Sequence, residues 1–408
     1  MDSAYNEMCV EFPKQCEAVR DEAHRFAHEI IRPAAMKMDR VADPGTLVSK
    51  DSPLWEVLKA AYGLGYHRIA LPSKFGGLGL PPIGVHAVME ELGWGSAGIA
   101  ISLMASAFPA LAVIADGRPE IIREFVTPFA ENHDASWIGC WALSEPRHGS
   151  DHFMVGSEEF RYPTESAQLV ARADGQEYTL DGYKAAWVTN GGIATHALCS
   201  VAIAPSKSAR GFVMIPLDLP GISRSAPTAK MGQREMNQGS IVFEGVKVPR
   251  RLMLKGEGYE QEVARLLAMT HCATAAIMTG VARAAYEEAL EHSKRRRQGG
   301  ARICDHQLVQ KEMFSMFTKV EACRALSRAT IGHNWATAHP SMESGIAAKT
   351  FCTRTAFEVA NGAMQLFGAD GFSTGNLVEK LFRDARVSLI EQGVNEALEV
   401  AAARRLVE

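Results

Sequence analysis

Near its C-terminal end the chain carries three consecutive residues that differ in what they can do with a proton: Glu391, Gln392 and Gly393. A carboxylate is a competent general base, whereas a carboxamide has no lone pair of comparable basicity. Earlier in the chain His271 follows Thr270, and a histidine can accept a proton near neutral pH. By residue type, Glu391 and His271 are therefore candidates for catalytic proton transfer, whereas Gln392 is not a competent base.

Two upstream segments place hydroxyl and aromatic side chains beside turn residues. Residues 140–151 lead from an apolar run into a Pro-containing turn and end at Gly-Ser-Asp, which includes Ser150. Residues 182–191 contain Trp187 and Thr189 and end in Asn-Gly. A strand that ends in a turn explains each pattern structurally.

The only dense basic run covers residues 294–297. Such runs are usually solvated helix ends, and the alternative is an anion site for the pyrophosphate of a cofactor. The glycines at 76–79 precede a predicted helix but do not follow a predicted strand. They therefore do not form a dinucleotide-binding fingerprint.

Together with the C-terminal stretch 383–396, these segments resemble the acyl-CoA dehydrogenase family of flavoproteins, and the resemblance covers nearly the whole chain. Residues 140–151 match the family's flavin-contacting strand and its Thr-Glu-Pro and Gly-Ser-Asp turn. Residues 182–191 match its Gly-x-Lys-x-x-Ile-Thr-Asn-Gly strand. Residues 230–249 resemble the end of its β domain, where we expect a structural role. The resemblance implies FAD as cofactor and dehydrogenation of an acyl thioester, on coenzyme A or a carrier protein.

The same resemblance implies roles for individual residues. Trp187 would pack against the flavin, and Thr189 would donate a hydrogen bond to its reactive edge. Ser144 keeps a hydroxyl where the family has Thr. Ser150 would lie near the CoA phosphates or pantetheine, and Gly393 would also contact substrate. The other implied cofactor contacts are Trp141, Leu143, Arg296, Gln365, Gly368, Val394 and Glu396.

The implied pyrophosphate contacts come from the C-terminal part of the chain. Arg296 would reach the pyrophosphate across a subunit interface, since a guanidinium suits two phosphate oxygens. Gln365 would reach it too, and the glycines that follow permit close backbone approach. Val394 and Glu396 stand where the family often has Thr and Gln, near the adenine end.

The chain departs from the family at the catalytic base. The family usually has Glu directly before the glycine, where it removes the α-proton, and here that place holds Gln392. A local slip of one residue would restore Glu391. Some members place the base on the first long C-terminal helix, where this chain has Thr270, followed by His271. Three functions stay open: a dehydrogenase with a relocated base, an oxidase or hydroxylase of the same fold that uses oxygen, and a non-catalytic flavoprotein subunit.

The elements that must position these residues follow an α+β order. Residues 1–135 read as a helical domain, with helices predicted over 15–34, 81–93 and 99–115. Residues 136–250 read as a small antiparallel β domain that contacts flavin and substrate, because short apolar runs alternate with turns. Residues 251–408 read as a helical bundle for flavin binding and oligomerisation. Its predicted helices cover 258–298, 306–334, 342–368, 376–388 and 394–406.

Length and composition limit the class of protein. The 408 residues suit two or three domains, and the net charge of −4 gives no general attraction to nucleic acid. The eight cysteines form no Cys-x-x-Cys pair, so we expect free thiols and no metal site. We find no signal peptide and expect no membrane span, hence a cytoplasmic protein. From the resemblance we also expect a homotetramer or homodimer, and an electron-transfer flavoprotein is a candidate electron acceptor.

Overall fold

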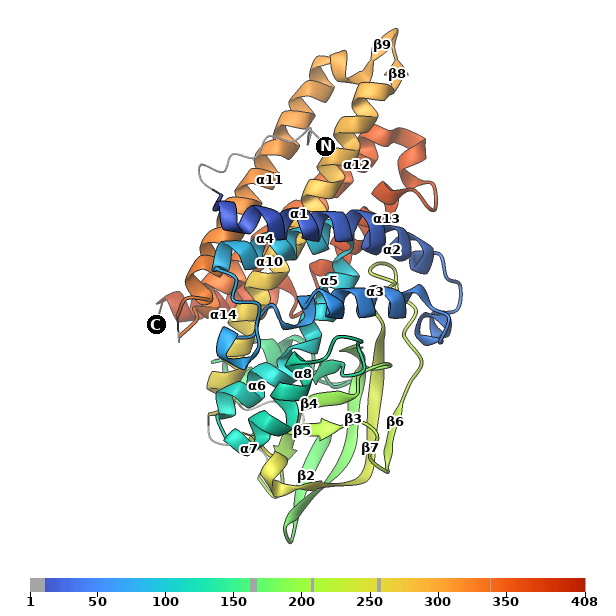
Figure 1. Ribbon diagram of the computed structural model, residues 1–408. Helices are drawn as coiled ribbons and strands as arrows, with labels where there is room; N and C mark the ends of the chain where they lie inside the picture. Colours follow the sequence, from blue (N-terminus) through green and yellow to red (C-terminus); the bar gives the residue numbers. More distant parts are fainter. Residues whose placement is uncertain (1–11, 162–166, 207–208, 255–257, 338, 408) are drawn as a thin grey trace.

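A computed structural model describes residues 12–161, 167–206, 209–254, 258–337 and 339–407. The fold has three parts in chain order: helices, then a sheet, then a helical bundle. Figure 1 shows the sheet at one end of the molecule, the bundle at the other, and several N-terminal helices between them. This confirms the predicted α+β class. Cys9 and the start of the chain lie outside the described residues.

The N-terminal part consists of short helices. They are α1 (Lys14–Phe26), α2 (Arg32–Asp39), α3 (Pro53–Gly63), α4 (Pro82–Gly95), α5 (Ala97–Ser106), α6 (Phe108–Asp116), α7 (Pro119–Ile121) and α8 (Thr127–Ala130). Two of these helices begin at a serine that caps them: Ser52 and Ser96 cap α3 and α5 by accepting hydrogen bonds from backbone N–H groups. The single helix predicted over 99–115 is two helices, α5 and α6. The break falls at Ala107, just before Pro109, which has no N–H to donate.

Although we expected no membrane span, the run Ala97–Asp116, which comprises α5 and α6, is a candidate by its composition. Its 20 residues are long and apolar enough to cross a membrane by length and composition. In this fold 94 % of its most apolar 18-residue window is buried inside the protein. The run is therefore accounted for as core, against which the sheet and the long bundle helix pack.

The central part is a seven-stranded sheet with the order β1-β4-β2-β3-β7-β6, and β5 pairs with β4. Its strands are β1 (Gly139–Ala142), β2 (Leu169–Asp174), β3 (Glu177–Thr189), β4 (His196–Ile203), β5 (Arg210–Pro216), β6 (Ile222–Arg224) and β7 (Gln238–Pro249). Most pairings are antiparallel, as predicted. However, β4 runs parallel to both β1 and β2, so the predicted antiparallel domain is a mixed sheet at this point. A short helix, α9 (Glu158–Arg161), lies between β1 and β2 in sequence.

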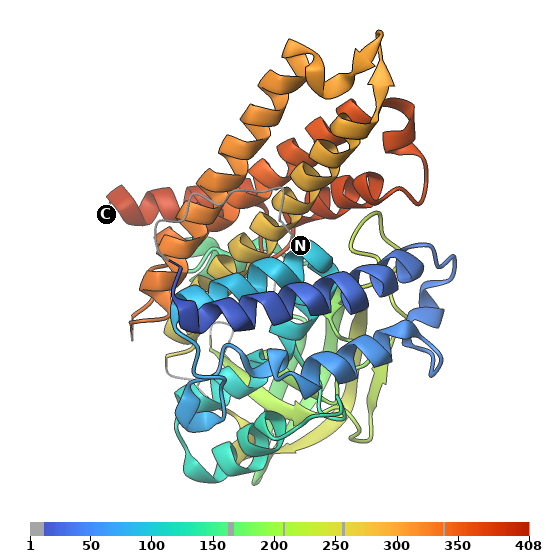
Figure 2. The ribbon, with the colours of Figure 1, turned by 45° about the horizontal axis from the view of Figure 1, so that its top comes forward.

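The C-terminal part is a bundle whose helices match the predicted segments. They are α10 (Tyr259–Arg295), α11 (Gln307–Asn334), α12 (Met342–Phe367), α13 (Leu377–Ser388) and α14 (Asn395–Val407). Ser341 and Asn376 cap α12 and α13. A small hairpin, β8 (Arg297–Gln298) with β9 (Ala301–Arg302), follows α10. In Figure 2 the bundle lies above the N-terminal helices, which separate it from much of the sheet.

Two glycines let α4 and α10 cross at backbone contact. A Cβ on Gly93 would lie 2.1 Å from the carbonyl oxygen of Ile277, and one on Gly280 would lie 2.0 Å from that of Glu90. Neither position has room for a larger residue. The guanidinium of Arg283 on α10 also binds Glu90 at 3.0 Å. The crossing therefore fixes α10, and with it every side chain that α10 carries into the site, against the N-terminal helices.

Candidate functional site

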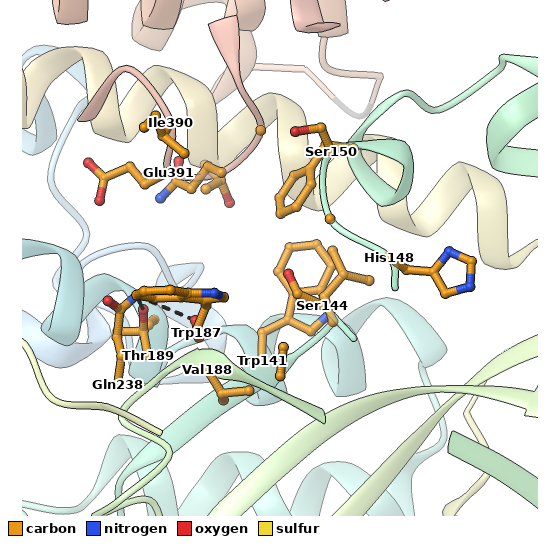
Figure 3. A pocket seen from close by; sticks show the side chains of 18 of the residues that line it. Trp141, Ser144, His148, Ser150, Trp187, Val188, Thr189, Gln238, Ile390 and Glu391 are labelled. Atoms are coloured by element: carbon orange, nitrogen blue, oxygen red, sulfur yellow. Dashed lines mark hydrogen bonds between the residues drawn. The ribbon is translucent and has the colours of Figure 1, made fainter. Parts of the chain in front are cut away.

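A cavity of ≈ 700 Å³ lies where the sheet, α5, α6, α10 and the segment after α13 meet. It brings together nine of the residues singled out from the sequence. They are Trp141, Leu143, Ser144, Ser150, Trp187, Thr189, Glu391, Gln392 and Gly393. Figure 3 shows Ile390 and Glu391 on one side of the cavity and Trp187 and Thr189 on the other. Segments far apart in sequence thus form two facing walls.

A β-bulge aims Trp187 into the cavity. The pairing of β3 with β7 loses register between Lys184 and Val188, and such bulges commonly redirect a side chain beside a site. Trp187 is consequently 56 % exposed, although β3 is an inner strand of the sheet. Beyond the bulge, the hydroxyl of Thr189 accepts a hydrogen bond from Gln238 Nε2 at 3.3 Å. This wall therefore offers a broad aromatic face and a fixed hydroxyl.

A buried ion pair holds the turn that carries Ser144. Lys184 Nζ donates to Glu145 Oε1 at 2.7 Å, and both side chains are almost fully buried. The other oxygen of Glu145 accepts the backbone N–H of Gln168 at 2.5 Å. The backbone N–H of Ala185 donates to the carbonyl oxygen of Ser144 at 3.0 Å. Glu145 lines the cavity, but its carboxylate is committed to these contacts and is not available as a base.

The opposite wall is the turn from Ile390 to Val394, and four side chains fix it. Thr274 Oγ1 donates to Gln392 Oε1 at 2.5 Å. Lys349 Nζ donates to the carbonyl oxygen of Gly393 at 2.8 Å. His271 contacts the carbonyl oxygen of Gln392, and Ser150 Oγ accepts the backbone N–H of Val394 at 3.2 Å.

Gln392 has a backbone φ of 56°, a left-handed conformation that is costly for a residue with a Cβ. The following residue, Gly393, has a φ of 100°. The contacts from Thr274 and His271 hold the strained residue in place. The turn is therefore constrained by the surrounding helices rather than by its own preference.

Glu391 is the acid that faces the cavity without an ion-pair partner among the described residues. Gln233 Nε2 donates to Glu391 Oε1 at 3.0 Å. Burial raises the pKa of Glu391, and the Gln233 hydrogen bond and the ammonium groups of Lys349 and Lys230 only partly oppose this. A buried carboxylate with a raised pKa is a stronger base than a solvated one.

His271, the other candidate base, does not line the cavity. It is fully buried, and its Nε2 lies 3.1 Å from the carbonyl oxygen of Gln392. A carbonyl can only accept, so Nε2 carries the proton and the basic nitrogen is Nδ1, which is buried with no partner among the described residues. Burial lowers the pKa of His271 to about 3, and Lys349 adds to the effect. Thr270 lines the cavity, and its hydroxyl donates to Leu266 O at 2.7 Å.

Sequence reasoning missed several residues of the site. Lys230, in a segment for which we expected only a structural role, lines the cavity. Its Nζ donates to Met236 O at 2.6 Å and to Gln238 Oε1 at 2.8 Å, and burial lowers its pKa to about 8. Lys349 was missed too, although a lysine on the buried face of an amphipathic helix was a detectable signal. Gln233 had no local signal.

The residues implied to bind pyrophosphate do not line the cavity. Arg296 follows the last turn of α10, and Gln365 and Gly368 lie at the end of α12. The two helix ends are adjacent, because the rings of His292 and Phe367 stack at 4.0 Å. Roughly 33 Å of α10 separate Thr274, which binds Gln392, from Arg296. The three residues therefore form a second group at the far end of the bundle.

Two further implied cofactor contacts lie at the start of α14. Val394 contacts a residue of the cavity through its backbone N–H, which donates to Ser150 Oγ. Glu396 is in the first turn of α14, where its carboxylate lies 3.7 Å from Arg354 Nη2 and is largely exposed. The structure thus places neither side chain in the cavity lining.

One cluster among the described residues has the composition of a metal site: His148, Asp151 and His152. However, His148 Nδ1 already binds Asp151 at 2.7 Å. Arg210 Nη1 donates to His152 Nε2 at 3.0 Å, which occupies the lone pair that a metal would need, while Nδ1 of His152 contacts Leu143 O at 3.2 Å. The cluster is a hydrogen-bonded network that supports the cavity rim.

Comparison with known proteins identifies the family of this chain. Three family models match the chain in order: the N-terminal, middle and C-terminal domains of acyl-CoA dehydrogenase, over residues 13–133, 140–246 and 256–407. The chain belongs to the acyl-CoA dehydrogenase family. The match spans all three parts of the fold.

Individual relatives agree with the family models along their whole length. A probable acyl-CoA dehydrogenase of Bacillus subtilis is 27 % identical, covering 98 % of this chain and 100 % of the relative. The human mitochondrial short-chain specific acyl-CoA dehydrogenase is 27 % identical, covering 98 % and 91 %. The solved structure of butyryl-CoA dehydrogenase from Megasphaera elsdenii superposes with a TM-score of 0.85 at 25 % identity, covering 98 % and 100 %.

The cofactor of this family is FAD, and the cavity fits its ring system. Trp187 supplies an exposed aromatic face, and Ser144 and Thr189 supply hydroxyl groups on the same wall. Trp141 lines the cavity too, and its Nε1 is buried with no partner among the described residues. A buried donor without a partner is costly unless a ligand accepts from it. This chain is therefore an FAD-dependent oxidoreductase of the acyl-CoA dehydrogenase family.

Proposed function

We propose that this protein dehydrogenates an acyl thioester and that Glu391 is its catalytic base. The observation that carries the proposal is the placement of Glu391 on the cavity wall that faces Trp187 and Thr189. The other acid lining the cavity, Glu145, is neutralised by Lys184. Gln392 cannot accept a proton.

In the proposed reaction the Glu391 carboxylate takes the α-proton of the substrate. The Cα–H electron pair becomes the second bond between Cα and Cβ as the β-hydrogen leaves with its electron pair. FAD, when bound, supplies the acceptor for that hydride. The hydroxyl groups of Thr189 and Ser144, which line the cavity, would donate hydrogen bonds to the bound cofactor. Gln392, held by Thr274, keeps the turn in place, and His271 positions the turn rather than reacting.

The shape of the cavity supports an acyl substrate. Ile101, Met104 and Phe108 come from α5 and α6, Leu267 comes from α10, and all four line the cavity. An apolar wall of this kind favours a hydrocarbon chain, because the transfer of apolar surface from water is favourable. Ser150 also lines the cavity. We propose that the thioester carrier, coenzyme A or a carrier protein, enters beside it.

Further parts of the proposal rest on family resemblance. We propose that Arg296, Gln365 and Gly368 bind the FAD of a neighbouring subunit in a homodimer or homotetramer. Their distance from the cavity of their own chain supports this. An electron-transfer flavoprotein is the proposed acceptor of the electrons, and the cytoplasm is the proposed location.

The test is anaerobic reduction of the bound flavin by a panel of acyl-CoA and acyl-carrier thioesters, followed by bleaching of its visible absorbance. The wild-type protein should be bleached by at least one thioester. Glu391→Gln should slow bleaching by about 10²–10⁴-fold, the usual contribution of a general base. His271→Gln should keep most of the rate, as should the control Glu399→Gln, which removes a carboxylate that pairs with Arg354 outside the cavity.

Full activity in Glu391→Gln would refute the assignment of the base. If no thioester bleaches the wild-type flavin, turnover with an external reductant and oxygen would support oxygen chemistry instead. Bound flavin that is inert in both assays would identify a non-catalytic subunit.

A further inference from the structure

The contact between Gln233 and Glu391 joins two segments that are 158 residues apart in sequence. Gln233 lies in the segment between β6 and β7 and is fully buried. Its Nε2 donates both to Glu391 Oε1, at 3.0 Å, and to the carbonyl oxygen of Asp384, at 3.3 Å. One amide group thus binds both the Glu391 carboxylate and the backbone of α13.

The backbone of Gln233 is strained to make this contact. Its φ is 48°, in the left-handed region that is unfavourable for a residue with a Cβ. Its backbone N–H donates to the Asp384 carboxylate, which anchors the strained residue. Strain of this kind persists only where the surrounding structure enforces it, and it gathers at functional sites.

The neighbouring charges act on Glu391 through space. Lys230 from the β6–β7 segment and Lys349 from α12 favour its ionised form, whereas Asp384 on α13 opposes it. The hydrogen bonds of the two ammonium groups go to other acceptors: Met236 O and Gln238 for Lys230, and Gly393 O and Asn395 for Lys349.

The other charged or titratable side chains near this turn bind groups other than Glu391. Lys380 pairs with Asp384 and with Glu235, the latter at 2.8 Å. On α10, the titratable group that contacts this turn is His271, whose Nε2–H is committed to Gln392 O. Among the described residues, Gln233 is therefore the side chain with a direct hydrogen bond to the Glu391 carboxylate.

We propose that Gln233 is the positioning residue of the catalytic carboxylate: its amide N–H fixes Oε1 of Glu391 and leaves the second oxygen for the substrate proton. This inference rests on the proposed role of Glu391 as base. A hydrogen bond to the ionised form stabilises that form. The Gln233 hydrogen bond thus opposes the rise that burial causes in the pKa of Glu391.

The test measures the rate of anaerobic flavin reduction against pH in the FAD-loaded protein. Gln233→Met has nearly the same volume but lacks the N–H donor. A hydrogen bond to a charged group is strong enough that its loss should raise the acid limb of the profile by about one pH unit. Gln233→Glu places a second carboxyl beside Glu391 and should raise the limb further, because two adjacent carboxyls cannot both ionise freely.

The control is Gln310→Met, which removes a glutamine whose side chain donates to the carbonyl oxygen of Cys304 on the surface. Its profile should match the wild type. If Gln233→Met does not retain FAD, Gln233→Glu, which has the same size as the native residue, decides the result. An unshifted acid limb in a Gln233 variant that binds FAD would overturn the proposal.

Failure of this proposal is distinguishable from failure of the proposed base. If Glu391→Gln retains full flavin reduction, the base assignment itself is wrong. If Glu391→Gln is inactive but the Gln233 profiles are unshifted, only the positioning role is wrong. The double variant Gln233→Glu/Glu391→Gln keeps one carboxyl and one carboxamide in contact, and it should fold, bind FAD and remain inactive, since its carboxylate is on the wrong residue.

Discussion

Replacement of Lys349 by methionine should damage catalysis far more than stability. The lysine is fully buried on α12, and its Nζ donates to the carbonyl oxygen of Gly393 at 2.8 Å and to Asn395 Oδ1 at 2.7 Å. It therefore anchors the turn that carries Glu391. Methionine has a similar shape but cannot donate a hydrogen bond.

Two energetic effects of this change oppose each other. The variant leaves two buried acceptors unpaired, which costs about 1–3 kcal/mol for each. Burial also lowers the pKa of Lys349 to about 7, although the nearby carboxylates of Glu391 and Glu396 oppose the shift. A shift of roughly three units from the usual value corresponds to roughly 4 kcal/mol of destabilisation at neutral pH, which methionine removes. We therefore expect the free energy of unfolding to change by less than about 2 kcal/mol.

The catalytic effect has no such compensation. A reacting group displaced by about 1 Å can lose about 10²-fold in rate, and the turn of Gly393 loses its only cationic anchor among the described contacts. The assays are the urea midpoint of the FAD-loaded protein and the rate of anaerobic flavin reduction. The control is Lys319→Met, which removes a surface ion pair with Glu358. A variant at position 349 that reduces flavin at the wild-type rate would refute the reasoning.

The pH dependence of stability gives the same variant a second signature. Because the folded-state pKa of Lys349 is depressed, the unfolded chain binds more protons than the folded one between about pH 7 and pH 10. This lysine therefore makes wild-type stability rise with pH across that window. The methionine variant should lack that rise, as urea midpoints at pH 7 and pH 9 would show.

Two more predictions concern residues outside this anchor. Asp39→Asn should destabilise the protein by about 3 kcal/mol at pH 7, because it breaks the buried bidentate contacts of Arg383 with Asp39, at 2.9 and 2.6 Å. Burial raises the pKa of Asp39, but the Arg383 hydrogen bonds and nearby cations outweigh this effect and lower the pKa. The stabilisation is therefore present above about pH 4, the unfolded value, and is lost as the pH falls through the folded pKa. Urea midpoints of the variant and the wild type should converge in acid, and a constant gap between them would contradict this reasoning. Thr189→Val should keep FAD bound but slow anaerobic flavin reduction by about 10²-fold, because it removes a hydroxyl donor at the cavity wall; an unchanged rate would remove Thr189 from the catalytic group.

The sequence was most informative where function depends on local pattern. The bundle helices follow the 3.6-residue repeat of apolar side chains, so their ends were predicted closely. Ser144, Trp187 and Thr189 lie in strand-and-turn motifs, and all three line the cavity. The break at Ala107 was missed because the apolar pattern continues through it, although Pro109 signalled a helix start.

The missed features depend on contacts between distant segments. The parallel pairing of β4 with β1 and β2 depends on how the chain crosses the sheet, which a strand pattern does not encode. Gln233 lies in a buried turn with no periodic signal, and its role is visible only once α13 brings Glu391 against it. The placement of His271 was also beyond sequence reasoning: its residue type suits a base, but its burial behind Gln392 does not.

The glycine crossing of α4 and α10 means that the width of the active cavity is set by residues that never touch it. The Cβ positions of Gly93 and Gly280 are occupied by the opposing backbone, so an added methyl group at either would push the two helices apart. The helix that moves carries Leu267, Thr270 and Thr274, and the helix that follows α4 carries Ile101 and Met104. Tolerance to substitution in this enzyme should therefore not decline smoothly with distance from the flavin: two small residues in the core act as spacers of the catalytic walls.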